Sequence, residues 1–242
     1  AAVQAQRKDL IGVLLYAILE KALKSSPKLY WGPLFQDMLT QVEQKHVLFY
    51  IYNSDAQSGI EALNAAGKIR PYDGDYLHIN QANFAGAKAN LFVEEAVDQD
   101  YEVSGDGMIT KKLTINYKNS HPPSDCNLER GRLCLNAVLR DWIRIYVPKG
   151  SKLLDSQGSE VKMTSYDELG KTVFEGFLTV RPLGVATFSL SYSLPFRVAD
   201  GNLPLLIQKQ PGTNANEYTI NVRGKEINKF PLLTDREIRL KL

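Results

Sequence analysis

The spacing of apolar residues changes near position 97, and the secondary structure that it predicts changes with it. Before that point apolar residues recur every three or four positions, as on one face of a helix. After it apolar and polar residues alternate, as in strands with one buried face. The pattern predicts an α+β fold, with a helical and βαβ-like segment over residues 1–96 and an antiparallel β-sandwich over residues 97–242.

The first segment is expected to hold three helices and two strands. The apolar run from Leu10 to Leu19 is too short to span a membrane and is interpreted as a buried helix. A second helix is expected from Pro33, and a third between Asn53 and Ala66. Strands are expected at residues 46–52, buried on both faces, and at residues 75–80. Because one such βαβ-like unit makes a poor domain, we expect residues upstream of Ala1 to be absent.

The second segment has a hairpin signature followed by a series of short strands. Val97 to Val103 and Met108 to Tyr117 flank a turn with Asp106-Gly107, a pair that favours hairpin turns. Further strands are expected at residues 142–147, 171–180, 186–194, 203–208, 218–222 and 237–240. Six or more short strands with regular turns are typical of a sandwich, and a closed barrel is the alternative.

Composition removes several classes of function. The chain has 242 residues and a formal net charge of +2, so there is no broad electrostatic case for binding nucleic acid. Phosphate-binding, dinucleotide-binding and nucleophile-elbow motifs are absent from the sequence, and so is a set of metal ligands with recognisable spacing. We therefore expect no cofactor and no metal.

Two cysteines, Cys126 and Cys134, lie eight positions apart in a polar stretch. A disulfide between them would close a small ring and stabilise the chain by roughly 2.5 kcal/mol. Two reduced thiols are the alternative, and the residues alone do not decide between them.

Polar side chains gather where the strand at residues 75–80 meets its flanking loops. Asp73, Asp75, Asn83 and Lys88 offer carboxylate, amide and ammonium groups that could bind a hydroxyl-rich ligand. The alternative, which we favour, is turn chemistry for Asn83 and simple solvation for Lys88. A nearby acidic run, residues 94–100, is interpreted as a solvated segment rather than a cation site.

A row of large side chains follows one face of a predicted strand. Trp142, Arg144 and Tyr146 share that face because side chains alternate along a strand. If exposed, the row would form a contact surface for carbohydrate or protein. The row could equally belong to the sandwich core.

Several sequence blocks resemble, in order, the C-terminal half of the bacterial domain-of-unknown-function family 4012. The blocks are KHVLFYIYNSDAQ (45–57), GDYLHINQANFAGAKANLFVEEAV (74–97), KLTINYKN (112–119), LRDWIRIYVPKGSKLL (139–154), ELGKTVFEGFLTVRP (168–182) and LIQKQPGT (206–213). The resemblance implies a membrane-anchored bacterial surface protein, some of whose relatives are linked to cell-surface polysaccharide. It implies an extracytoplasmic location, with the anchor and first half of the family domain missing from this chain. An oxidising exterior would favour joining Cys126 to Cys134.

These observations lead to one expected function and one alternative. We expect a non-catalytic, extracytoplasmic module that binds or organises cell-surface glycan or envelope protein, with contact to the membrane only through the missing anchor. The alternative is an enzyme that acts on envelope polysaccharide or a lipid-linked sugar. Its site would lie near Asp75, Asn83 and Lys88 and would be completed by the missing upstream half.

Overall fold

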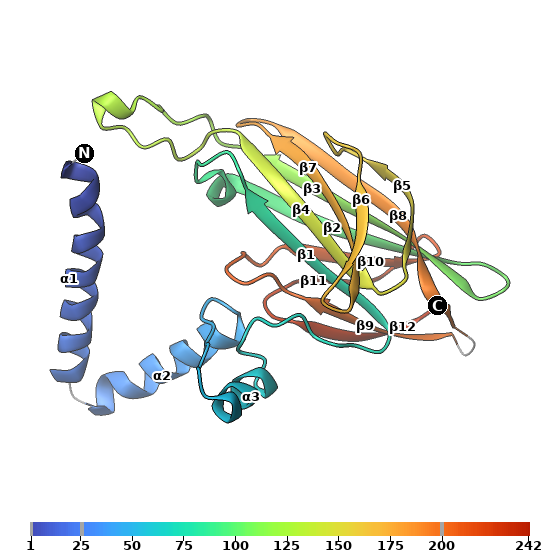
Figure 1. Cartoon of the computed structure of the whole chain (residues 1–242), viewed down its shortest axis with the longest axis horizontal. Helices are drawn as coiled ribbons and strands as arrows, with labels where there is room; N and C mark the ends of the chain where they lie inside the picture. The colour runs from blue at the N-terminus through green and yellow to red at the C-terminus, as the bar shows by residue number, and fades with distance from the viewer. Residues whose placement is uncertain (1, 25–26, 199–200) are drawn as a thin grey trace.

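The computed structural model describes residues 2–24, 27–198 and 201–242. Its main body is a sandwich of two six-stranded sheets packed face to face (Figure 1). Three helices of the described N-terminal residues lie outside the sandwich: α1 (Ala2–Lys24), α2 (Pro27–Glu43) and α3 (Ser54–Ala62). The α+β class and the sandwich arrangement expected from the sequence are confirmed.

We refer to the two sheets as sheet A and sheet B. Sheet A consists of β1 (Asp75–Asn83), β4 (Leu139–Pro148), β6 (Thr164–Glu168), β7 (Lys171–Val180), β9 (Asn202–Gln208) and β12 (Arg236–Lys241), in the order β12-β9-β1-β4-β7-β6. Sheet B consists of β2 (Val93–Val103), β3 (Met108–Asn119), β5 (Lys152–Gln157), β8 (Val185–Arg197), β10 (Glu217–Val222) and β11 (Lys225–Pro231), in the order β11-β10-β2-β3-β8-β5. Short 3-10 turns lie at Ala89–Phe92 and Leu128–Arg130.

Strand pairing is mostly antiparallel, but each sheet contains one parallel pair. β1 runs parallel to β9, and β2 runs parallel to β10. A parallel pair needs a long connection, so these two pairs join segments far apart in the sequence. The expectation of a purely antiparallel sandwich therefore needs this correction. The β2–β3 hairpin is present, and Gly107 at its turn adopts a left-handed φ of 79°.

The core lies between the inner faces of the two sheets. Leu77, Ile115, Phe174, Phe188 and Leu205 are among its fully buried side chains. Every strand that the sequence predicted from residue 97 onwards is present. The strands β5, β6 and β11 were not predicted, because they lie at sheet edges and lack a regular alternation of buried and exposed side chains.

The N-terminal segment departs from the expected βαβ-like unit. Residues 46–52 do not form a strand, since the run has no partner strand; its Phe49 amide donates instead to the Ala65 carbonyl at 2.9 Å. β1 consequently pairs with β4 and β9 in sheet A. The first residues of β2, which were also expected in the N-terminal segment, pair with β3 in sheet B. α3 begins after an Asn53 cap, as expected, but ends at Ala62.

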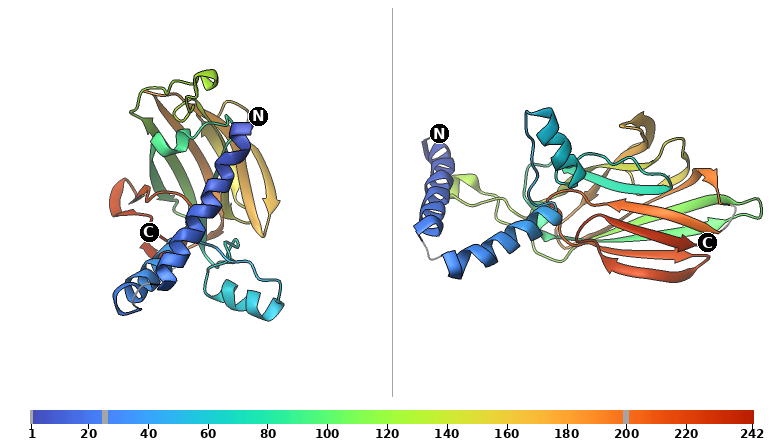
Figure 2. Two further views of the ribbon diagram at one scale, coloured as in Figure 1. Left: turned by 90° about the vertical axis from the view of Figure 1, so that its left-hand side faces the viewer. Right: turned by 90° about the horizontal axis from the view of Figure 1, so that it is seen from below.

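The apolar run on α1 is exposed, which corrects the expectation of a buried helix. Large apolar side chains between Leu10 and Leu19 are 52–71% exposed, because α1 stands away from the sandwich (Figures 1 and 2). α2 begins at Pro27, earlier than expected, and carries Pro33 inside. Of the helices that the structure describes, none has the length and apolarity required to cross a membrane.

Buried polar contacts attach the end of the helical segment to the sandwich. Lys45 is 1% exposed, and its ammonium lies 3.1 Å from Asp235 and 3.0 Å from the side-chain oxygen of Asn64. Lys209, just after β9, donates to the Gln44 carbonyl at 3.1 Å. These contacts fix residues 44–64 against the edge of sheet A formed by β9 and β12.

Candidate functional site

An aromatic surface lies on the outer face of sheet A, near the end of β1. Phe84, Trp142 and Phe177 form this aromatic patch. The Phe84 ring lies 5.6 Å from the Trp142 ring and 6.0 Å from the Phe177 ring, in edge-to-face contact with both. Phe84 is 62% exposed and is the outermost member of the patch. Sequence analysis singled out Trp142 but missed Phe84 and Phe177, because β1 and β7 come beside β4 only in the folded sheet.

Arg144 holds the neighbouring part of this surface in place. Its guanidinium lies 4.5 Å from the Trp142 ring centre and 5.7 Å from the Tyr146 ring centre. It also donates to the side-chain oxygen of Asn80 at 2.8 Å. Trp142, Arg144 and Tyr146 thus share one face, as the alternation predicted. One face of Trp142 is covered by Arg144, so the surface open to a partner is centred on Phe84.

Tyr146 supports the sheet rather than facing solvent. It is buried with Tyr76, Val173 and Leu206 on the outer face of sheet A, under residues 69–72. Its hydroxyl donates to Glu168 at 2.5 Å, and burial raises its pKa above the ordinary tyrosine value. Of the predicted row, Trp142 contributes to the exposed patch and Tyr146 anchors the covering loop.

The four polar candidates around β1 do not form a common site. Asp75 begins β1 and Asn83 ends it, which places them about 26 Å apart along an extended strand. The Asn83 amide donates to the Ala87 carbonyl at 3.0 Å and its oxygen accepts from the Ala85 amide at 2.9 Å, which is turn chemistry. Lys88 and Asp73 are exposed in the flanking loops.

Asp75 lies inside the sandwich, where it forms an ion pair. Its carboxylate accepts hydrogen bonds from the Lys111 ammonium at 2.7 Å and the Tyr101 hydroxyl at 2.6 Å. Both charged side chains are 0% exposed. Burial lowers the pKa of Lys111, and the charge of Asp75 opposes that shift. Asp75 is therefore a structural residue that no ligand reaches.

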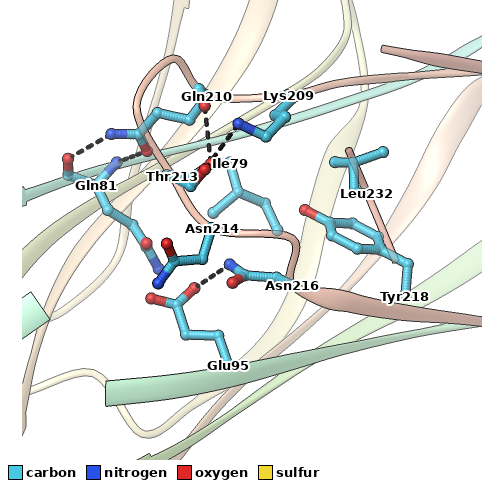
Figure 3. A pocket seen from close by; sticks show the side chains of 10 residues that line it. All are labelled: Ile79, Gln81, Glu95, Lys209, Gln210, Thr213, Asn214, Asn216, Tyr218 and Leu232. Atoms are coloured by element: carbon cyan, nitrogen blue, oxygen red, sulfur yellow. Dashed lines mark hydrogen bonds between the residues drawn. The ribbon is translucent and has the colours of Figure 1, made fainter. Parts of the chain in front are cut away.

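A polar pocket opens where β1, β2 and the loop between β9 and β10 meet (Figure 3). Glu95 on β2 accepts from the Asn216 amide at 3.0 Å. With its amide oriented to satisfy both neighbours, Gln81 donates to Glu95 at 3.1 Å and accepts from the Tyr117 hydroxyl at 2.6 Å. Burial raises the pKa of Glu95 to about 7, although the hydrogen bond from Gln81 opposes the shift.

A second carboxyl group, that of Asp141 on β4, faces the sandwich interior and interacts electrostatically with Glu95. Asp141 is 1% exposed, and neither of its oxygens has a hydrogen-bond partner among the residues that the structure describes. Burial first, and then the charge of Glu95, raises its pKa to about 8, although the backbone N–H of Ala82 opposes the shift. This end of the sandwich therefore holds two acids whose charged forms are disfavoured.

The alternation of apolar and polar residues in β2 carries a signal that Glu95 faces inward, which the sequence analysis missed. Residues 94–100 form part of β2 rather than a solvated junction, and odd-numbered residues of that strand face inward. Val93 and Val97 flank Glu95 in this alternation. Extending the pattern back by four residues would have placed Glu95 on the buried face.

The other chemical candidates take structural roles. Cys126 and Cys134 form a disulfide in the loop between β3 and β4. Among the described residues, no group of three or more His, Cys, Asp or Glu side chains could hold a metal ion.

Comparisons with known proteins place this chain in no family. No family model matches, and no curated protein matches. A putative nutrient binding protein from Legionella pneumophila shares 9% identity at a TM-score of 0.37, with 62% of this chain and 55% of that chain covered. An M1 zinc metallopeptidase from Deinococcus radiodurans shares 11% identity at a TM-score of 0.26, covering 65% of this chain and 33% of the peptidase. The chain thus spans about half or less of the solved structures that it resembles, and it resembles them only distantly.

Proposed function

We propose that this chain is a non-catalytic module that binds cell-envelope glycan through the aromatic patch on sheet A. The observation that carries the proposal is the exposed Phe84 ring, supported from below by Trp142 and Phe177. Aromatic rings backed by a rigid sheet offer a sugar ring an apolar face at little cost in conformational entropy.

Charged donors beside the patch fit the same ligand class. The Arg140 guanidinium lies 5.7 Å from the Phe177 ring centre and 3.5 Å from the Glu160 carboxylate, and its side chain is largely exposed, which leaves further N–H donors open to solvent. It can donate several hydrogen bonds to sugar hydroxyl or carboxylate oxygens. Arg144 is less available, because Asn80 and two aromatic rings already surround it.

The disulfide supports an extracytoplasmic location. Disulfides persist in oxidising compartments and are rare in the cytosol. The proposal places the module at the cell surface of a bacterium, held there by an anchor outside this chain. An envelope protein, rather than a glycan, is the other kind of partner that the patch could contact.

The enzyme alternative has lost the residues on which it depended. Asp75 is enclosed in the sandwich, Asn83 is used in a turn and Lys88 is an exposed residue of the loop after β1. An active site would need other residues, and the binding interpretation does not require one.

Glycan-array binding of the purified chain tests the proposal. We expect Phe84→Ala to weaken binding roughly tenfold or more, as for a central aromatic contact. Trp142→Ala should weaken binding as well, by removing the support under Phe84. Tyr52→Ala, which removes an exposed aromatic ring in the segment just before α3, is the matched control and should bind like the wild type.

Two results would contradict the proposal. One is unchanged glycan binding by a correctly folded Phe84→Ala variant. The other is an absence of glycan binding by the wild type combined with capture of a defined envelope protein that Phe84→Ala fails to capture, which would assign the patch to a protein partner.

A further inference from the structure

The Glu95 carboxylate in the polar pocket has no cationic partner among the residues that the structure describes. Neither Glu95 nor Asp141 behind it forms an ion pair with a described residue, whereas Asp75 in the same sandwich is paired with Lys111 at 2.7 Å. A carboxylate removed from water is stabilised chiefly by an opposite charge or by several hydrogen-bond donors. From the part of the chain that the structure describes, Glu95 receives two amide donors and no cation.

One cation that lines the pocket, Lys209, is already engaged elsewhere. Lys209 lines the pocket on the far side of Thr213 from Glu95 (Figure 3). Its ammonium donates to the Thr213 carbonyl at 2.8 Å and to the Gln44 carbonyl at 3.1 Å. It therefore fixes the loop after β9 and does not reach the carboxylate of Glu95.

The pocket is concave and has room for a small group. Its wider part has a volume of about 270 Å³ and is lined by Glu95, Asn214, Asn216, Leu91 and Pro211, among others. That volume is near the lower limit of small-molecule sites, about 300 Å³. It suits a single sugar ring or the end of a side chain.

The oxygen atoms around the pocket match the needs of a three-donor cation. An ammonium group has three N–H donors and accepts nothing. The amide nitrogen of Asn216 donates to Glu95, which leaves its side-chain oxygen as an acceptor next to that carboxylate. Asn214 offers a second amide oxygen on the same loop.

We propose that this pocket binds a primary ammonium group, with the Glu95 carboxylate as counter-ion and the side-chain oxygens of Asn214 and Asn216 as further acceptors. Such a group is carried by a non-acetylated amino sugar or by a lysine side chain. The inference goes beyond the glycan contact at Phe84, because it concerns a different surface and a different chemistry.

Paired probes, in which acetylation of the nitrogen removes its positive charge, test the proposal. Glucosamine is compared with N-acetylglucosamine, and Nα-acetyl-lysine amide with its side-chain-acetylated form, by NMR titration at about pH 7.5. That pH keeps a large share of Glu95 ionised, since its pKa is about 7. We expect the amine of each pair to bind at least about tenfold more tightly and to shift the Asn214 and Asn216 side-chain amides. The pair with the stronger preference identifies the source of the ammonium group.

Glu95→Gln keeps the shape of the side chain and removes its charge. It should weaken amine binding about tenfold and leave the acetylated probes unaffected. Glu102→Gln makes the same change on the exposed face of β2, at the opposite end of the strand, and should bind like the wild type. Circular dichroism and thermal unfolding confirm that both variants fold.

Three outcomes would overturn the ammonium site: equal binding of amine and acetylated probes, unchanged amine binding by a folded Glu95→Gln variant, or no binding of either amine up to about 10 mM. The glycan proposal is tested separately by Phe84→Ala, which should retain amine binding at the pocket. Loss at only one of the two surfaces therefore shows which proposal has failed.

Discussion

Two buried aspartates, Asp75 and Asp141, face the interior of the same sandwich in opposite electrostatic surroundings. Asp75 begins β1, whereas Asp141 on β4 pairs in register with Asn83 at the other end of that strand. Asp75 has Lys111 and Tyr101 as hydrogen-bond donors. Asp141 has no side-chain donor within the described residues, only the backbone of Ala82 favours its charged form, and it has Glu95 as an acidic neighbour.

The difference separates a structural carboxylate from a responsive one. A buried ion pair keeps its charge because the partner offsets the loss of solvation, and breaking it leaves an uncompensated charge. A buried acid without a cation holds its proton instead, so its state depends on pH and on any cation that arrives. The contribution of the Asp75 end of the sandwich to stability is therefore expected to stay constant across neutral pH. The contribution of the Glu95–Asp141 end is expected to change with pH.

The largest effect is expected from breaking the ion pair. Lys111→Met should lower the free energy of unfolding by about 3–5 kcal/mol, because Asp75 is left charged and unpaired in the core. Chemical denaturation at pH 7 measures the change. Lys112→Met, one residue along on the exposed face of β3, is the control and should change stability by less than about 0.5 kcal/mol.

The double variant Asp75→Asn/Lys111→Met sharpens this test. Removing both charges should recover a large part of the lost stability, since no unpaired ion remains. Equal stability of Lys111→Met and the wild type would show that the pair is not the structural element described here.

A smaller change in the free energy of unfolding is expected when pH titrates Glu95 and Asp141 at the opposite end of the sandwich. The folded-state pKa values of Glu95 and Asp141 are raised to about 7 and about 8, so the folded protein holds these protons more tightly than the unfolded chain does. Stability should therefore fall as pH rises from about 6.5 to about 8.5, by about 3 kcal/mol. Denaturation at a series of pH values measures it.

Asp141→Asn provides the matched variant for the pH series. It mimics the protonated acid, so it should remove much of the decrease and be more stable than the wild type at about pH 8.5. A wild type that gains stability over this pH range would contradict the assignment of raised pKa values.

The disulfide is expected to contribute about as much to the free energy of unfolding as the titration of Glu95 or Asp141. Cys126→Ser/Cys134→Ser opens a ring with a sequence separation of eight residues and should lower stability by roughly 2.5 kcal/mol in the chain-entropy model. Thermal unfolding with and without reductant checks it. Labelling of the denatured, non-reduced wild type should find no free thiol, and two labelled thiols would contradict the disulfide.

The smallest effect on stability is expected at the aromatic patch. Phe84→Ala removes a largely exposed ring and should change the free energy of unfolding by less than about 1 kcal/mol, while glycan binding falls. A stability loss of about 3 kcal/mol or more would indicate a packing role and would weaken its assignment as a contact residue.

The sequence predicted the sandwich better than the N-terminal segment, for a physical reason. Alternation in β3 is visible because Leu113, Ile115 and Tyr117 face a core that this chain itself supplies. The run at residues 46–52 has strand-forming residues but no neighbouring strand, and local propensity does not provide one. The exposed apolar face of α1 has the same explanation, since periodicity reports an apolar stripe and not what covers it.

The candidate sites were predicted only where they lie on one strand. Trp142 and Arg144 share a face by local geometry, so their neighbourhood could be foreseen. The joining of Asp75 to Lys111, and of Glu95 to Asn216, depends on strand order and on the packing of one sheet against the other. Nothing in the local sequence reports those contacts.

Carboxyl-carbon NMR titration of Glu95 and Asp141 tests the central contrast most directly. The account predicts that both resonances change chiefly between about pH 6 and 9, with apparent pKa values near those that burial gives, about 7 and about 8. In Glu95→Gln, the apparent pKa of Asp141 should fall, because its acidic neighbour is gone. Completion of both titrations below about pH 5 would show that these acids are as well compensated as ordinary surface carboxylates, and would contradict the account.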